Sequence, residues 1–220
     1  MGLTDNFTKV TNKMLATGQP AQLVAVTKTV GIDVIEQLYA LGQRHFGENR
    51  ADVLTAKQAA LSDKYPDIVW HFIGSLQTRK VKEVLPATTY IHSLDRLSLA
   101  KEINKRATEE SNCFVEVNVA GEANKHGMAP DDVIPFIEQL THYPNIKVVG
   151  LMTMAPFVAS EQELHEVFAQ LKQLTNDVQA LQLKHAPCLE ASMGMSNDYQ
   201  IALQEGATFV RVGTELVTVN

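Results

Sequence analysis

Cysteine is scarce in this chain, and so are long apolar runs and basic residues. The two cysteines, Cys113 and Cys188, lie far apart beside apolar residues, which fits neither a disulfide framework nor a zinc site. No apolar run approaches the length of a membrane span, and the first residues lack the apolar core of a signal peptide. These absences predict a cytoplasmic protein with buried free thiols and no contact with a membrane.

Positive charge is also limited, with 19 Lys and Arg against 25 Asp and Glu and a formal net charge of -6. This balance argues against a broad surface for nucleic acid, so any anion site must be local. No low-complexity tract or shift in composition marks a linker. Residues 1–220, of which 45% are hydrophobic, therefore predict a single domain with a well-filled core.

Short apolar runs alternate with longer amphipathic segments along the whole chain. Rich in Val, Ile and Phe, the apolar runs predict eight buried strands. They occupy residues 22–28, 44–49, 68–74, 89–93, 113–119, 146–154, 186–193 and 207–213. Strands that alternate with helices indicate parallel βαβ units, and eight such pairs predict a closed (β/α)8 TIM barrel. An open doubly wound sheet is the alternative, but the first run lacks its G-x-G-x-x-G fingerprint.

The helices are predicted from apolar residues spaced three and four apart. The clearest covers residues 161–181, and an additional helix over residues 3–16 precedes the first strand. Asp95 is expected to cap a helix that begins at Arg96, and Gly206 stands where a helix is expected to end.

Two glycine- and hydroxyl-containing strings, SMGMSND and GTE, lie at the ends of the predicted seventh and eighth strands. In barrels of this type, phosphate often binds the loops after these two strands. Ser196, Gly213 and Thr214 would offer hydroxyls and backbone N–H groups, and a helix beginning near Asn197 would direct its positive end to the same place. The plainer alternative is that Ser196 or Asn197 only caps a helix, with Asn197 and Gln200 as a capping box.

Lys28 closes the first apolar run, and in a closed barrel it would lie beside the eighth strand and Arg211. A partly desolvated lysine near a phosphate site is suited to forming a Schiff base with a carbonyl. Each residue also has a plainer interpretation. Lys28 could be a strand end that reaches solvent, and Arg211 could pair with a carboxylate inside the barrel.

Other candidates carry less information. Asn49 ends the second apolar run and could bond a ligand ring or simply form a turn. Met193 is more often a packing residue, although its thioether could lie against a planar ring. His45, His71 and His92 lie in or near strands, where hydrogen-bonded core histidines are expected. No residues show metal-ligand spacing, so no metal is expected.

Seven strings recur in one family in this order, and they cover nearly the whole chain. They are VAVTK (24–28), HFGENR (45–50), WHFIGSLQ (70–77), VNVAGEANKHG (117–127), GLMTMAP (150–156), SMGMSND (192–198) and VRVGTE (210–215). With them the sequence resembles the pyridoxal phosphate homeostasis protein family, whose fold is like the barrel domain of alanine racemase. Two departures are Arg79, where the family usually has Asn, and a short LVTVN end.

The resemblance implies pyridoxal 5'-phosphate (PLP) as the cofactor, held as a Schiff base on Lys28. Arg211 would face the pyridine nitrogen, and Asn49 would lie beside the ring. The phosphate would be held by Ser196, Gly213 and Thr214.

The function that the resemblance implies is PLP homeostasis by a non-catalytic carrier that stores the cofactor or delivers it to PLP-dependent apoenzymes. The chain ends at Asn220, soon after the eighth strand, so the β domain that completes related racemases is expected to be absent. A small PLP-dependent racemase or decarboxylase is the alternative. From the residues alone, a Schiff-base aldolase acting on a phosphorylated sugar also stays open. A monomer is expected, with no nucleic-acid partner.

Overall fold

The structure is a computed structural model that describes residues 2–123 and 126–218. Two strings named above extend beyond these ranges. Asn124 and Lys125 of VNVAGEANKHG, and the last two residues of LVTVN, lie outside the described residues.

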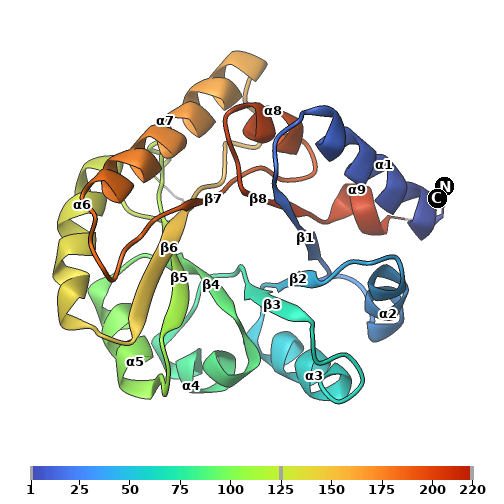
Figure 1. Cartoon of the computed structure of the whole chain (residues 1–220), viewed down its shortest axis with the longest axis horizontal. Coiled ribbons are helices and arrows are strands. Elements are labelled where there is room, and N and C mark those ends of the chain that lie inside the picture. The colour runs from blue at the N-terminus through green and yellow to red at the C-terminus, as the bar shows by residue number, and fades with distance from the viewer. Residues whose placement is uncertain (1, 124–125, 219–220) are drawn as a thin grey trace.

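Eight parallel strands close into one barrel in which every strand pairs with the next along the chain and β8 pairs with β1 (Figure 1). The predicted (β/α)8 barrel is therefore confirmed, and the open-sheet alternative is wrong. The strands are β1 (Gln22–Val26), β2 (His45–Glu48), β3 (Val69–Phe72), β4 (Tyr90–Leu94), β5 (Ser111–Glu116), β6 (Ile146–Met152), β7 (Glu190–Ser192) and β8 (Phe209–Val212).

Helices surround the barrel, and the expected additional helix, α1, precedes β1 (Figure 1). The helices are α1 (Leu3–Ala16), α2 (Ile32–Ala40), α3 (Ala51–Leu61), α4 (Val81–Val84), α5 (Leu97–Arg106), α6 (Pro130–Gln139), α7 (Glu161–Ala180), α8 (Tyr199–Gln204) and α9 (Thr214–Val217). Short 3-10 turns occupy Thr78–Lys80, Leu85–Ala87 and Leu140–His142. None of the helices in the described residues combines the length and apolar character needed to cross a bilayer.

The helix ends show which local sequence signals correctly predict where a helix begins or ends. At α7 the Ser160 hydroxyl accepts a hydrogen bond from the Glu163 N–H, and the Glu163 carboxylate accepts one from the Ser160 N–H. Gly206 has the positive φ of 85° expected just after a helix. The expected cap by Asp95 is wrong, because α5 begins at Leu97 without a side-chain cap and Asp95 pairs with Arg96 instead.

The interior of the barrel contains buried polar residues beside its apolar packing. A large apolar cluster fills the space between strands and helices, whereas a small one, formed by Val24, Phe114, Met152 and Phe209, packs separately from it. Side chains alternate across each strand, so Arg211 shares a face of β8 with Phe209. Apolar packing therefore occupies only part of the interior, which leaves room for buried polar groups.

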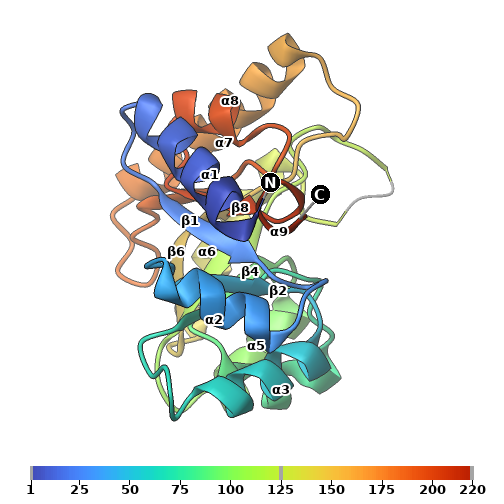
Figure 2. The same ribbon diagram turned by 90° about the vertical axis from the view of Figure 1, so that its right-hand side faces the viewer.

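All strands run in the same direction, so their carboxyl ends meet at one end of the barrel. In Figure 2, β1 runs from left to right, which places this carboxyl end at the right and the amino end, the face seen in Figure 1, at the left. Because β8 pairs with both β7 and β1, the loops that follow these three strands are neighbours.

Candidate functional site

Lys28 lies just beyond the carboxyl end of β1, beside the segment that follows β8. The two strands are in register, with Val24 opposite Arg211, and Gly213 packs closely on Val26. The predicted neighbourhood of Lys28 and the Gly213 turn is therefore confirmed. Lys28 itself is exposed, so the expectation of partial desolvation is wrong and its amine is open to a ligand.

Ser196 joins the loop after β7 to the turn after β8. Its Oγ accepts hydrogen bonds from the backbone N–H groups of Gly213, at 3.2 Å, and Glu215, at 3.3 Å. Ser196 does not cap α8, which begins at Tyr199 after Asp198, so the capping interpretation is wrong for this serine and for Asn197. A hydroxyl and two N–H groups thus converge where the sequence predicts phosphate to bind.

The loop after β7 depends on a glycine. Gly194 has a φ of 91°, and a Cβ there would lie 2.6 Å from the Cβ of Ala202 and 2.8 Å from the Cα of Tyr199. One residue later, the Met195 N–H donates to the Asp198 carboxylate at 2.5 Å. The chain therefore turns sharply directly after β7, which brings Ser196 back over the carboxyl end of the barrel.

Arg211 lies inside the barrel and is only 4% exposed. Its guanidinium donates to the Ser192 Oγ at 2.6 Å and to the Thr153 carbonyl at 3.0 Å. No carboxylate in the described residues lies within ion-pair distance, so the carboxylate-pairing interpretation of Arg211 is wrong. Burial lowers the pKa of Arg211 to about 10, and it remains a cation at neutral pH.

Two buried carboxyl groups share the electrostatic field of Arg211 without touching it. Burial, together with the charge of Asp95, raises the pKa of Glu116 to about 7, and Arg211 opposes that shift. Burial also raises the pKa of Asp198, and its hydrogen bond from Met195 and the charge of Arg211 oppose this. The carboxyl end of the barrel therefore contains a group that exchanges protons near neutral pH.

The remaining predicted residues lie in different surroundings. Asn49 follows β2, is exposed, and lines a cleft of about 340 Å³ with Ser75 and Gln77. Met193 is fully buried in the large apolar cluster, which favours its packing role over contact with a ligand ring.

A buried ion pair that the sequence did not predict lies directly beneath Lys28. The Lys57 ammonium on α3 donates to the Glu48 carboxylate at 2.7 Å and to the Thr27 carbonyl at 2.8 Å. The Thr27 hydroxyl donates to the same Glu48 oxygen at 2.6 Å. This cluster holds the ends of β1 and β2, which carry Lys28 and Asn49. The one available signal was a glutamate inside the apolar run HFGEN.

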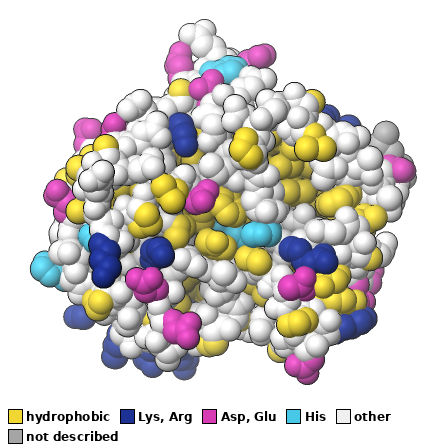
Figure 3. Space-filling model, in the orientation of Figure 1, with side chains coloured by type: hydrophobic (Ala, Val, Ile, Leu, Met, Phe, Trp, Pro, Cys, Tyr) yellow, Lys and Arg dark blue, Asp and Glu magenta, His cyan; other side chains and the backbone are white. Residues whose placement is uncertain are grey.

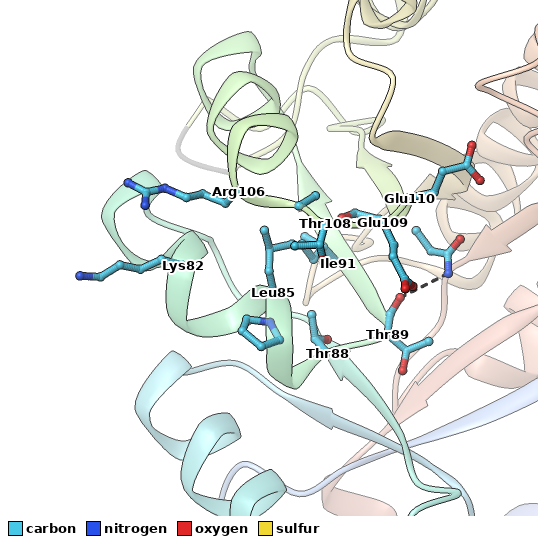
Figure 4. Close-up of a pocket in the computed structure, with 13 residues that line it drawn as sticks. Lys82, Leu85, Thr88, Thr89, Ile91, Arg106, Thr108, Glu109 and Glu110 are labelled. Atoms are coloured by element: carbon cyan, nitrogen blue, oxygen red, sulfur yellow. Dashed lines mark hydrogen bonds between the residues drawn. The ribbon is translucent and has the colours of Figure 1, made fainter.

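A cavity of about 540 Å³ lies away from these residues, at the amino end of β4 and β5 (Figure 4). Lys82 and Arg106 extend from one side of it, and Glu109 and Glu110 from the other (Figure 4). Its lining mixes both signs of charge and lacks a buried polar group aimed inward. Chemistry is better supported at the carboxyl end, where an open amine, a buried cation and an anion cradle meet.

Comparisons with known proteins show the family of this chain. The family model of the alanine racemase N-terminal domain matches residues 2–220. A pyridoxal phosphate homeostasis protein from Aquifex aeolicus (strain VF5) is 42% identical over 199 residues, which cover 89% of this chain and 86% of that protein. The chain belongs to the pyridoxal phosphate homeostasis protein family.

Solved structures show the same fold. PipY of Synechococcus elongatus PCC7942 without PLP has a TM-score of 0.90 at 34% identity, and covers 99% of this chain and 100% of that chain. The PLP-bound structure of PipY has a TM-score of 0.88 at 32% identity, with the same coverage. Alanine racemase from Clostridium difficile 630 shares the fold at 15% identity, with a TM-score of 0.75 over 98% of this chain and 57% of that one.

Proposed function

We propose that this member of the pyridoxal phosphate homeostasis protein family binds PLP at the carboxyl ends of β7, β8 and β1. Lys28 would hold the cofactor through a Schiff base, in which the amine condenses with the aldehyde and releases one water. The carrier would store PLP or deliver it to PLP-dependent apoenzymes. The chain would act as a monomer in the cytoplasm, without nucleic acid.

The observation that carries this proposal is the meeting of three complementary groups at neighbouring strand ends. The exposed amine of Lys28 suits an aldehyde. The Ser196 hydroxyl with the N–H groups of Gly213 and Glu215 suits a phosphate, and Thr214 adds an exposed hydroxyl next to them. The name of the Aquifex relative and the PLP-bound state of PipY support the same ligand.

Arg211 supports a carrier more than a catalyst. A guanidinium that faces the pyridine nitrogen disfavours protonation of that nitrogen and weakens the ring as an electron sink. The Arg211 side chain is buried, fixed by Ser192 and Thr153, and free of any carboxylate partner in the described residues. The positive charge of Arg211 is therefore not neutralised by an ion pair, and it would favour an unprotonated pyridine nitrogen.

The visible absorption spectrum tests this proposal. The purified protein incubated with PLP should develop a Schiff-base band that borohydride abolishes, and Lys28→Ala should lack it. Lys101→Ala, which removes an exposed lysine of α5, is the matched control and should keep the band. A wild-type protein that takes up no PLP, or an equal band in Lys28→Ala, would overturn the proposal.

A PLP-dependent racemase or decarboxylase is the second candidate, and Glu116 is the observation that favours it. A carboxyl group with a pKa of about 7 can both accept and donate a proton at neutral pH. Incubation of the PLP-loaded protein with L-amino acids, followed by chiral and product analysis, separates the two candidates. Sustained turnover that Glu116→Gln abolishes would establish the enzyme and refute the carrier.

A further inference from the structure

Three histidines on consecutive strands form a hydrogen-bonded row inside the barrel. The His45 Nδ1 lies 2.9 Å from the His71 Nε2, and the His71 Nδ1 lies 2.9 Å from the His92 Nε2. The rings thus use one nitrogen toward each neighbour, in the same order along the row. Such a repeat of ring contacts does not follow from apolar packing, because any side chain of similar size would fill this space.

The row continues to Arg211 at the candidate site. The His92 Nδ1 lies 3.0 Å from the Ser192 Oγ, to which the Arg211 guanidinium donates at 2.6 Å. His71, His92 and Ser192 have no exposed surface. An unbroken line of hydrogen bonds therefore connects His45 on β2 with the buried cation at β8.

The opposite end of the row reaches the amino-terminal face of the barrel. His45 is the first residue of β2 and is only half-buried. Figure 3 shows this face, where histidine surface lies near the middle, with hydrophobic side chains to its left and a basic side chain to its right. The row therefore begins at solvent on the face opposite the proposed PLP site.

Both buried rings are insulated and neutral. His71 stacks on Tyr90, with ring centroids 4.8 Å apart, and His92 stacks on Phe114 at 4.3 Å. Burial lowers the pKa of His71 and His92 well below the usual histidine value, and the neighbouring rings and Arg211 add to this effect. Neutral imidazoles have one donor and one acceptor nitrogen, which is what a one-dimensional chain of hydrogen bonds requires.

Two arrangements of protons satisfy every bond in the row. Because a guanidinium only donates, the Ser192 Oγ must accept from Arg211, and its own hydrogen remains free to point elsewhere. In one arrangement the Ser192 hydroxyl donates to His92, and each ring donates through Nε2 toward His45. In the other, each ring donates through Nδ1, and the bonds point from His45 toward Ser192. The bonded atoms are the same in both.

We propose that His45, His71, His92 and Ser192 form a proton relay between solvent at the amino-terminal face and the Arg211 end of the candidate site. A proton that arrives on the His45 Nε2 releases the proton on its Nδ1 to His71. His71 then passes its Nδ1 proton to His92, and His92 passes its own to the Ser192 Oγ. The original Ser192 hydroxyl proton passes to a proton-accepting atom of the ligand that would lie beside Arg211, or to water there in the ligand-free protein. The same steps in reverse return a proton from that atom to solvent at His45. One proton enters, one leaves, and all three rings end neutral.

The relay gives the part of the site beside Arg211 a route for protons that does not pass through the carboxyl end of the barrel, where the ligand would enter. This consequence rests on the proposed PLP function, since it concerns the group that would face Arg211. A cofactor bound as proposed would cover the carboxyl-terminal entrance, whereas the relay reaches the same place from the opposite face. Ser192 is then a positioning residue that both orients Arg211 and ends the relay.

Hydrogen exchange of the buried ring N–H groups tests the relay in the ligand-free protein. In 15N-histidine-labelled protein, exchange of the His71 and His92 ring protons with water is measured by NMR. A relay exchanges these protons without opening the barrel, so His45→Phe should slow exchange by about tenfold or more. His45→Gln should do the same, because an amide accepts a hydrogen bond but does not pass a proton from one end to the other.

The control is His165→Gln, which removes a histidine of α7 that pairs with Glu205 at 2.6 Å on the outer surface. It should leave exchange at His71 and His92 unchanged. Equal exchange rates in the wild type and in both folded His45 variants would overturn the relay. A separate PLP titration keeps the two proposals distinguishable, since failure of the wild type to bind PLP refutes the proposed function and leaves the exchange result standing.

Discussion

Ser196 occupies a central place at the scale of single residues, because its one hydroxyl contacts two backbone N–H groups from another strand end. Ser196→Ala removes this acceptor and a donor for the phosphate. A hydrogen bond to a charged group contributes about 1.5 to 3 kcal/mol. We therefore expect the Kd for PLP to be about ten- to a hundredfold higher in Ser196→Ala than in the wild type, since about 1.4 kcal/mol of binding free energy corresponds to a tenfold change in Kd.

Equilibrium dialysis with PLP measures this change. Ser160→Ala is the matched control, because it removes a serine that caps α7 and lies on an exposed helix end. It should lower stability slightly and leave PLP affinity unchanged. An unaltered Kd for Ser196→Ala would show that its hydroxyl serves the two loops and not the ligand.

Glu116 gives a pH dependence whose sign follows from its raised pKa of about 7. Between about pH 4.5 and 7 the folded protein keeps a proton on Glu116 that the unfolded chain has lost. The stability that depends on a protonated Glu116 is fully present below the pKa of the unfolded chain. It is lost as the pH rises through the folded-state pKa. Glu116→Gln should thus gain stability relative to the wild type from pH 5 to pH 8, by about 2 to 3 kcal/mol.

Urea unfolding at a series of pH values measures this difference in free energy of unfolding. Glu138→Gln, on the exposed side of α6, is the control and should show a constant difference from the wild type. A constant difference for Glu116→Gln as well would mean that this carboxyl is ionised in the folded protein at pH 5.

The sequence was sufficient to predict which site residues converge where a residue belongs to a motif at a strand end. Lys28, Ser196 and Gly213 were predicted to converge, and the structure brings their loops together. Ser192 and His92 could not be predicted as partners, because they are 100 positions apart and meet only through the curvature of the barrel. Buried polar side chains inside an apolar strand are the signal that such partners leave in a sequence.

At the scale of elements, the ends of β1 and β2 are fixed by α3 through one buried ion pair. Lys57→Met removes the cation and leaves the Glu48 carboxylate buried without it, which should cost about 3 to 5 kcal/mol. Lys57→Met combined with Glu48→Gln should cost less than Lys57→Met alone, because no charge is then stranded. Urea unfolding of the wild type, both single variants and the double variant measures the coupling energy.

Lys64→Met provides the control, because Lys64 pairs with Glu36 at an exposed position and should have little effect on stability. If the loss in free energy of unfolding of the double variant equals the sum of the losses of the two single variants, Lys57 and Glu48 act independently. Lys57→Met should also weaken PLP binding, since Thr27, which Lys57 holds, precedes Lys28 directly.

The elements themselves were largely predictable because apolar periodicity decides which face of each is buried. The extents of α1 and α7 agree with the predicted ranges to within a residue. Strand β7 is much shorter than its apolar run, because Cys188 has a positive φ of 46° and interrupts the extended backbone. The predicted Asp95 cap is wrong because α5 begins at Leu97, one residue later than expected, and Asp95 pairs with Arg96, which takes the N-cap position.

At the scale of the whole molecule, the first and last described helices lie side by side (Figure 1). The Asn6 side chain on α1 is buried and donates to the carbonyls of Leu216, at 3.2 Å, and Thr218, at 2.8 Å. Lys9 and Lys13 on the same helix pair with Glu215. The N-terminal helix thus holds α9, whose first turn forms one wall of the proposed phosphate site.

Asn6→Ala should therefore act at a distance on the ligand. Loss of two hydrogen bonds should lower the free energy of unfolding by about 1 to 3 kcal/mol. Because α9 then loses its outer support, PLP affinity should fall as well. Urea unfolding and PLP titration measure the two effects, and Asn12→Ala, an exposed change on the same helix, should alter neither. A less stable variant with unchanged PLP affinity would show that α1 supports the barrel without supporting the phosphate loop.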